Sequence, residues 1–210
     1  MTLLHDRAER WFERASAALL AALPCGRGCH QCCIGLFAIT RLDADRLTAA
    51  LRALPPDHAD RIRSRARSQR TALEAAHPAL RETKTLDRWA DADVDAAAAQ
   101  FSAERCPALE DDGSCAVYAD RPMTCRMMGI PLEEDGVVRG ACAVQTAVPI
   151  VRLPTSHRKE EDRLTELEAR ALESRPSSGD GDEVWLPYGF LVDGDEDGCD
   201  DALDDRLDRW

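Results

Sequence analysis

The chain has few aromatic residues: phenylalanine, tryptophan and tyrosine make up 5% of its 210 residues. Hydrophobic residues make up 44%, but alanine supplies much of that share, so the core is expected to be modest. The length suits one domain with a tail. In a small core, crosslinks through metal ions are a useful source of stability.

A surplus of basic residues is also missing. The net charge is −12, and residues 180–210 carry 12 acidic and 2 basic side chains, so the rest of the chain is nearly neutral. Binding to a phosphate backbone or to an anionic membrane surface depends on clustered Lys and Arg. We therefore expect neither nucleic acid nor membrane as a partner.

The sequence shows no targeting or membrane segment. Residues 1–7 lack the order of a charged region followed by an apolar one that a signal peptide has, and no apolar run approaches the roughly 20 residues of a membrane span. A cytoplasmic protein is expected, and thiols there stay reduced. The odd number of cysteines, nine, also fits a disulfide framework poorly.

What the sequence has is a dense set of cysteines. Four lie within nine residues, and four more follow in the second half of the chain: Cys25, Cys29, Cys32, Cys33, Cys106, Cys115, Cys125 and Cys142. Thiolates are soft ligands that select zinc, copper(I) and iron–sulfur clusters, and a Cys-x2-Cys pair turns two sulfurs towards one metal. We predict that these eight cysteines bind metal and that Cys199, alone in the acidic tail, does not.

The identity of the metal stays open at this point. Eight cysteines exceed the needs of one zinc ion, which favours an iron–sulfur cluster or iron; zinc that only holds the fold together is the alternative. His30 lies inside the cluster and could replace a cysteine as a ligand. Arg121 and Arg126 flank Cys125, where they could stabilise thiolates or form ordinary salt bridges, for example to Asp120.

The apolar pattern predicts an α+β fold that is predominantly helical, with short β-hairpins and loops around the cysteine-rich metal centre. Apolar residues at helical spacing and proline breaks predict helices at 3–22, 42–54, 57–76, 85–101 and 157–172. Turns at Asp112-Gly113 and Asp135-Gly136 predict two hairpins. Trp11 is expected to pack in the core, and the histidines other than His30 are expected at the surface or on helices.

Two regions are predicted along the chain. A cysteine-cluster domain spans 1–175 and includes a helical insertion at 41–101, and an acidic tail spans 176–210. Within the tail, the apolar stretch 184–192 is expected to dock on the body. Asp193, Asp195, Asp197 and Gly198 resemble the start of a calcium loop, but the preceding Pro187 and Gly189 argue against a helix there and favour a solvated tail.

Several of these residues occur together in a known family. The segment 25–33 resembles the cysteine-cluster family named for its CxxCxxCC motif, the YkgJ-like proteins, although three residues rather than two separate Cys25 from Cys29. The segments 106–109, 113–118 and 121–126 also match the family, and Cys142 takes the place of its last cysteine.

The resemblance implies chelation of zinc or iron, with the eight cysteines as the metal ligands. It also implies a distant link to flagellin lysine N-methylases, which share the cysteine pattern. The glycine-rich fingerprint of nucleotide-binding folds is absent, which speaks against methylation. The expected function is therefore an iron–sulfur or iron protein with a role in redox chemistry or in modifying a protein partner. The alternative is a non-enzymatic zinc module that presents a partner-binding surface, and a modifying enzyme similar to the methylases is third.

Overall fold

The computed structural model describes residues 2–18, 29–128, 132–134, 137–139, 155–175 and 181–191. The α-helices are α1 (Thr2–Ala18), α2 (Arg41–Ala53), α3 (Pro56–Ala76), α4 (Leu80–Thr83), α5 (Asp91–Gln100), α6 (Met123–Met127) and α7 (Thr155–Glu173). The strands are β1 (Ala38–Thr40), β2 (Leu132–Glu134), β3 (Val137–Arg139) and β4 (Glu183–Trp185). Short 3-10 helices lie at η1 (Gln31–Cys33), η2 (Tyr118–Asp120) and η4 (Leu186–Phe190). The predicted class, predominantly helical α+β, is confirmed.

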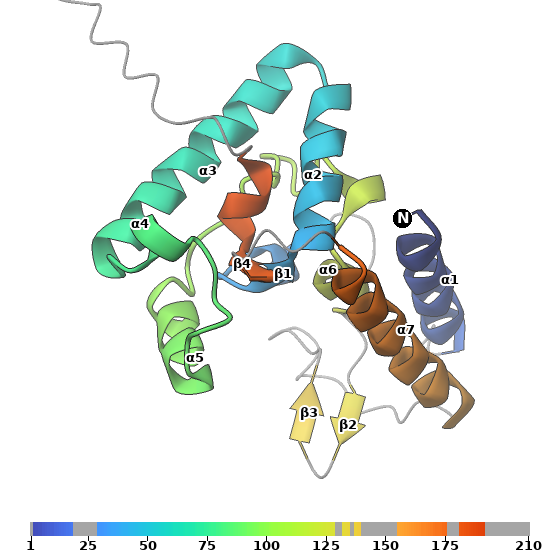
Figure 1. Ribbon diagram of the computed structural model, residues 1–210. Coiled ribbons are helices and arrows are strands. Elements are labelled where there is room, and N and C mark those ends of the chain that lie inside the picture. Colours follow the sequence, from blue (N-terminus) through green and yellow to red (C-terminus); the bar gives the residue numbers. More distant parts are fainter. Residues whose placement is uncertain are drawn as a thin grey trace, which may run out of the picture.

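Helices α2 and α3 form a V in the upper half of Figure 1. Helix α2 begins directly after β1, where the Thr40 hydroxyl accepts a hydrogen bond from the Asp43 N–H at 3.4 Å. It ends before Pro55, and Pro56 occupies the first turn of α3, where a missing N–H costs nothing. The proline pair therefore sets the corner between the two helices.

The opening of this V is filled by a segment from near the end of the described chain. Strand β4 pairs with β1 in antiparallel register, Ile39 opposite Val184, and η4 follows between α2 and α3 (Figure 1). Leu186 and Phe190 of η4 are buried in the main core. Gly189 fits only because it has no side chain, since a Cβ there would lie 2.6 Å from Ile39 Cδ1.

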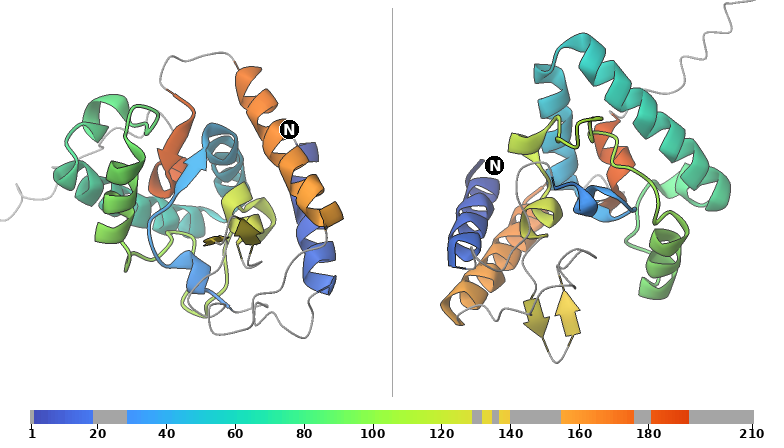
Figure 2. Two further views of the ribbon diagram at one scale, coloured as in Figure 1. Left: turned by 90° about the horizontal axis from the view of Figure 1, so that it is seen from below. Right: turned by 180° about the vertical axis from the view of Figure 1, so that it is seen from behind.

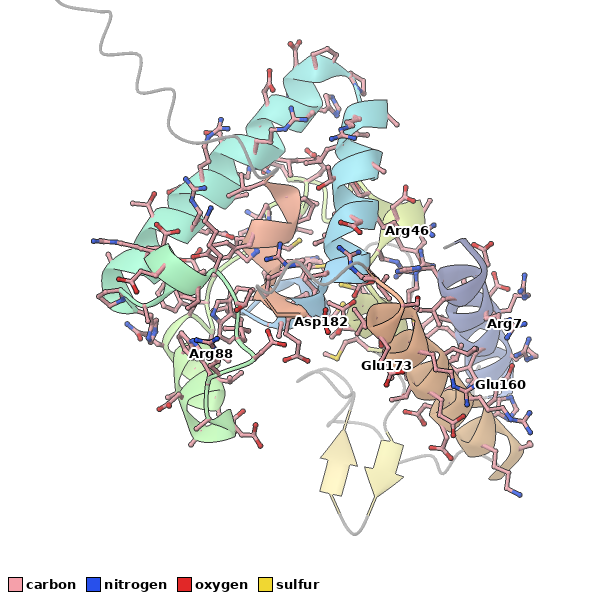
Figure 3. The ribbon with its side chains drawn as sticks, viewed as in Figure 1. Arg7, Arg46, Arg88, Glu160, Glu173 and Asp182 are labelled. Atoms are coloured by element: carbon pink, nitrogen blue, oxygen red, sulfur yellow. The ribbon has the colours of Figure 1, made fainter. Side chains whose placement is uncertain are left out.

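A second layer is made by α1 and α7, which lie side by side in both views of Figure 2. Trp11 is fully buried and packs in one cluster with Met123 of α6 and Leu164 of α7, so its predicted core position is confirmed. Its indole Nε1 donates to the His157 carbonyl at 2.9 Å. Figure 3 shows Glu160 on the α7 side of this pair of helices, where it forms an ion pair with Arg14 of α1.

A third cluster holds the end of α3, α4 and α5 against the strands. Trp89 packs edge-on to Trp185, with ring centroids 6.3 Å apart. The helix predicted from residue 85 starts only at Asp91, which corrects that prediction. Leu86 is buried and its N–H donates to the Glu183 carbonyl at 3.0 Å, so segment 85–90 lies against β4 instead of forming a helix.

The second predicted strand pair forms as expected. Strands β2 and β3 are antiparallel, with Leu132 opposite Arg139 and Glu134 opposite Val137. No helix among the described residues is both long enough and apolar enough to cross a membrane.

Candidate metal centre

The first cysteine segment lies directly against the second through backbone hydrogen bonds. The Cys106 N–H donates to the Cys33 carbonyl at 2.8 Å, and the Gly35 N–H donates to the Glu104 carbonyl at 2.7 Å. Ile34 and Arg105 form the antiparallel bridge between these two contacts. Gly35 has a φ of +108°, a backbone conformation that favours glycine. This short ladder brings sulfurs from residues 33 and 106 together across 73 positions of sequence.

A tight hairpin adds the next cysteine. Leu109 pairs with Cys115, and the Ala116 N–H donates to the Ala108 carbonyl at 2.9 Å. The predicted turn lies at its tip, where Gly113 has a φ of +81° and the Asp112 carboxylate accepts from the Ser114 N–H at 2.9 Å. The turn chemistry therefore determines where Cys115 stands relative to Cys106.

Helix α3 holds this hairpin from the outside. Arg65 donates from Nη1 to the carbonyls of Pro107 and Leu109 at 3.2 and 3.0 Å. Gln69 donates to the Arg105 carbonyl at 2.6 Å. These two side chains of α3 therefore position the cysteine-bearing backbone.

Cys125 comes from α6, whose start is tied to α2. The Met123 N–H donates at 3.0 Å to Asp43 Oδ1, which also lies 2.8 Å from His5 Nε2. Asp43 is 1% exposed, and His5 lies on helix α1, one of the two placements expected for it, with its side chain buried. A single buried carboxylate thus joins α1, α2 and α6 next to the cysteines.

The described cysteines line one cavity of about 400 Å³. They are Cys29, Cys32, Cys33, Cys106, Cys115 and Cys125. All six are free thiols. Cys25 and Cys142, the other two predicted ligands, fall outside the residues that the structure describes, as do Cys199 and the calcium-loop candidate at 193–204.

The described thiols line the same cavity, but their sulfur atoms are not grouped around a single point. Within the described ranges, no group of three or more His, Cys, Asp or Glu side chains is placed so that it could hold a metal ion. The donors nonetheless suit a soft metal in kind and in number. The structure therefore shows a thiol-lined cavity rather than a finished four-ligand shell, and the assignment of the cysteines as ligands stays a prediction.

Burial and neighbouring groups shift the pKa values of the thiols. The hydrogen bond from Cys33 lowers the pKa of Cys32, with further lowering by Arg121 and His30, while the same bond and burial raise the pKa of Cys33. Burial raises the pKa of Cys106 to about 12.

Cys115 and Cys125 behave alike. Burial raises the pKa of Cys115, and burial together with the charges of Cys106 and Cys32 raises the pKa of Cys125 well above its usual range. Most of these thiols are therefore protonated at neutral pH, and a metal that binds them must displace protons.

Two arginines stand next to the cysteines in different roles. Arg121 lines the cavity, lies 3.7 Å above the Tyr118 ring and lowers the pKa of Cys32, so it acts on the thiols as one reading of the sequence proposed. Arg126 is 3% exposed and donates to the Ala119 carbonyl at 2.6 Å and to the Arg121 carbonyl at 2.9 Å.

Both arginines share one carboxylate that no sequence pattern indicated. Arg126 forms an ion pair with Glu9 of α1, and Arg121 Nη2 lies 3.4 Å from the same carboxylate. The predicted partner Asp120 instead pairs with Arg46 at 3.1 Å; Figure 3 labels Arg46 on α2. Glu9 lies 112 residues before Arg121, so no local pattern could have linked them.

Comparisons with known proteins are consistent with this arrangement. No curated protein and no solved structure gives a significant match. The model of the CxxCxxCC family, described as "Putative zinc- or iron-chelating domain", matches residues 24–143, more than half of the chain, and this range contains all eight predicted ligands. The chain therefore belongs to the CxxCxxCC family.

Proposed function

We propose that the protein binds an iron–sulfur cluster in the cysteine-lined cavity and uses it in redox chemistry or in modifying another protein. The observation that carries this proposal is that six thiols line one cavity of about 400 Å³, more than the four ligands that one zinc ion needs. A tetrahedral zinc site needs four ligands in direct contact with one ion. A cluster places inorganic sulfide and several irons between more widely spaced thiolates.

The surrounding charges suit such a centre. Cluster–thiolate complexes carry net negative charge, and Arg121 at the cavity wall stabilises negative sulfur. Arg121 and Arg126 share the single carboxylate of Glu9, which leaves one positive charge uncompensated within this trio. When bound, a cluster would supply one-electron transfer or a Lewis-acidic iron.

The chain's own residues would do the rest. The Cys33–Cys106 backbone ladder and the hairpin to Cys115 would hold the thiolates, and α6 would add Cys125. Phe37, Leu47 and Phe190 close the inner side of the cavity and would keep water from the centre. Exclusion of water shifts the potential of a cluster and protects its sulfide from hydrolysis.

Purification of the full chain without oxygen tests the proposal directly. Iron and acid-labile sulfide are counted per chain, and the absorption spectrum is recorded before and after reduction. We expect iron and sulfide in similar amounts and a broad visible band that bleaches on reduction. A colourless protein that contains zinc and no iron after anaerobic handling, and that takes up no iron and sulfide on reconstitution, would contradict the proposal.

The second candidate is a zinc module without catalytic activity. It is favoured by the packing of Cys106 and Cys115 against the main core cluster, because an ion bound there would tie their hairpin to the core. It predicts zinc in whole-number ratio, no visible absorption and unfolding by a chelator. The protein partner, the cytoplasmic location and the more remote methylase-like activity stay predictions from the sequence.

A further inference from the structure

Apolar side chains form part of the wall of the same cavity. Leu47, Leu186 and Phe190 line it, are at most 2% exposed and belong to the main core cluster. Phe37 and Val117 continue the same wall. Metal ligation takes place through the sulfurs, and aliphatic and aromatic carbons contribute no ligand to it. The apolar wall therefore calls for an apolar occupant.

The size of the cavity leads to the same conclusion. Protein interiors are close-packed, with few voids larger than a water molecule. A hollow of about 400 Å³ lies within the range of sites that bind small organic molecules, about 300–1,000 Å³. Such sites combine mostly apolar walls with a few polar groups that orient the ligand.

The polar group here is Arg121, which is the only charged side chain among the described residues that line the cavity. Its Nε donates to the Tyr118 carbonyl at 3.1 Å and its Nη2 faces Glu9, while Nη1 carries further N–H groups. The Tyr118 ring beneath it is 55% exposed, so this pair stands where the cavity reaches solvent. A fixed guanidinium at the mouth of an apolar cavity selects an oxygen acceptor.

We propose that the cavity is a substrate site for a small organic molecule with an apolar body and a carbonyl or carboxylate head. The body would lie on Leu47, Leu186 and Phe190, and the head would accept hydrogen bonds from Arg121. The inference rests on the proposed function in one respect: it takes the thiol wall to be the place of the metal centre, which puts the bound molecule next to it. The site itself exists with or without that metal.

Binding of defined probes to the full chain tests this inference. The probes are 3-phenylpropionate and 3-phenylpropionamide, which share an apolar body and differ in the charge of the head, together with acetate, which lacks the body. Affinities are measured by calorimetry and by saturation-transfer NMR on chains whose metal content is determined in the same sample. We expect both phenyl compounds to bind at least tenfold more tightly than acetate. The ratio of the affinities of 3-phenylpropionate and 3-phenylpropionamide shows whether the site prefers a charged head.

Two variants locate the probe. Arg121→Gln should weaken 3-phenylpropionate binding about tenfold, whereas Arg46→Gln, a matched change at an arginine outside the cavity lining, should leave it unchanged. Val117→Phe should weaken binding of both phenyl compounds because the larger ring occupies the cavity. Circular dichroism identifies variants that fail to fold. The comparison of the three probes on the parent chain tests the proposal even if a variant does not fold.

The outcomes separate the two proposals. Equal binding of acetate and the phenyl compounds, or equal effects of the two arginine changes, would overturn the substrate site whatever metal is found. A chain that takes up no iron and sulfide on reconstitution but still binds the phenyl compounds through Arg121 would refute the cluster and support the site.

Discussion

The Asp43 carboxylate lies 2.8 Å from the imidazole Nε2 of His5, and both side chains are almost completely buried. The same oxygen accepts the Met123 N–H at the start of α6, two residues before Cys125. Because an ionised carboxylate can only accept hydrogen bonds, Nε2 is the donor. This contact joins the α1–α7 layer to the main core and places one side of the cysteine cavity.

Removing that carboxylate should destabilise the whole domain. Asp43→Ala leaves the His5 Nε2 and the Met123 N–H without their acceptor in a buried site, and breaking a buried polar pair costs about 3 kcal/mol. Urea unfolding should show this loss. Asp45→Ala is the matched control on the same helix, because Asp45 is 48% exposed in its pair with Arg175; it should cost less than about 1 kcal/mol. Similar losses for both variants would contradict a structural role for the buried pair.

Arg126 should matter far more than an arginine at the surface. It is 3% exposed and contacts Glu9 and the carbonyls of Ala119 and Arg121, so Arg126→Gln should lower the free energy of unfolding by about 2–3 kcal/mol. Arg14→Gln removes a half-exposed pair with Glu160 and should cost less than about 1 kcal/mol. Glu9→Gln and the double variant complete a cycle, and a coupling energy near zero would show that Glu9 and Arg126 do not act together.

Loss of a cavity thiol should be distinguishable from loss of a thiol elsewhere. Cys125→Ser replaces a soft ligand with a hard, weakly acidic hydroxyl, so bound iron should fall several-fold and the metal-loaded chain should unfold at a lower temperature. Cys199→Ser should change neither quantity. Metal analysis and thermal unfolding of anaerobically purified proteins measure both effects. If the two variants retain equal metal, Cys125 is not a ligand.

A pH dependence is expected at Glu168 of α7. Burial, and then the nearby Asp43 carboxylate, raise its pKa, with Glu183 adding to the rise; hydrogen bonding from Thr40 and the proximity of His5 oppose it. The folded chain therefore binds this proton more tightly than the unfolded chain. The stability that protonation contributes is fully present below the unfolded pKa, about 4.3, and is lost as the pH rises through the raised folded value.

In the Glu168→Gln variant, residue 168 no longer titrates, so its contribution to the free energy of unfolding does not depend on pH. The amide oxygen can still accept the hydrogen bond that the Thr40 hydroxyl donates at 3.2 Å. Thermal unfolding should show the variant to be more stable than the parent at pH 7, with the difference vanishing towards pH 4. Glu166→Gln, on the same helix but 64% exposed, should show no gain at pH 7. A Glu168→Gln variant that is less stable at pH 7 and unchanged at pH 4 would reverse the expected sign.

Local patterns anticipated the elements whose causes are local. The proline break before α3, the Asp112-Gly113 turn and the β2–β3 hairpin each depend on a few adjacent residues, and all appear in the structure. The start of α5 was missed because segment 85–90 is held by β4, a strand almost 100 residues away. Local preference gives way where a distant backbone offers a hydrogen bond.

The sequence by itself determined the chemistry: its cysteines, their spacing and their family pattern are visible without any structure. Only the tertiary structure decided that six of the thiols share one cavity, that apolar side chains line the same cavity and that Glu9 binds both arginines beside them. The physical reason is that ligand type belongs to each residue, whereas the meeting of residues 33 and 106, or of 9 and 126, depends on long-range pairing and packing.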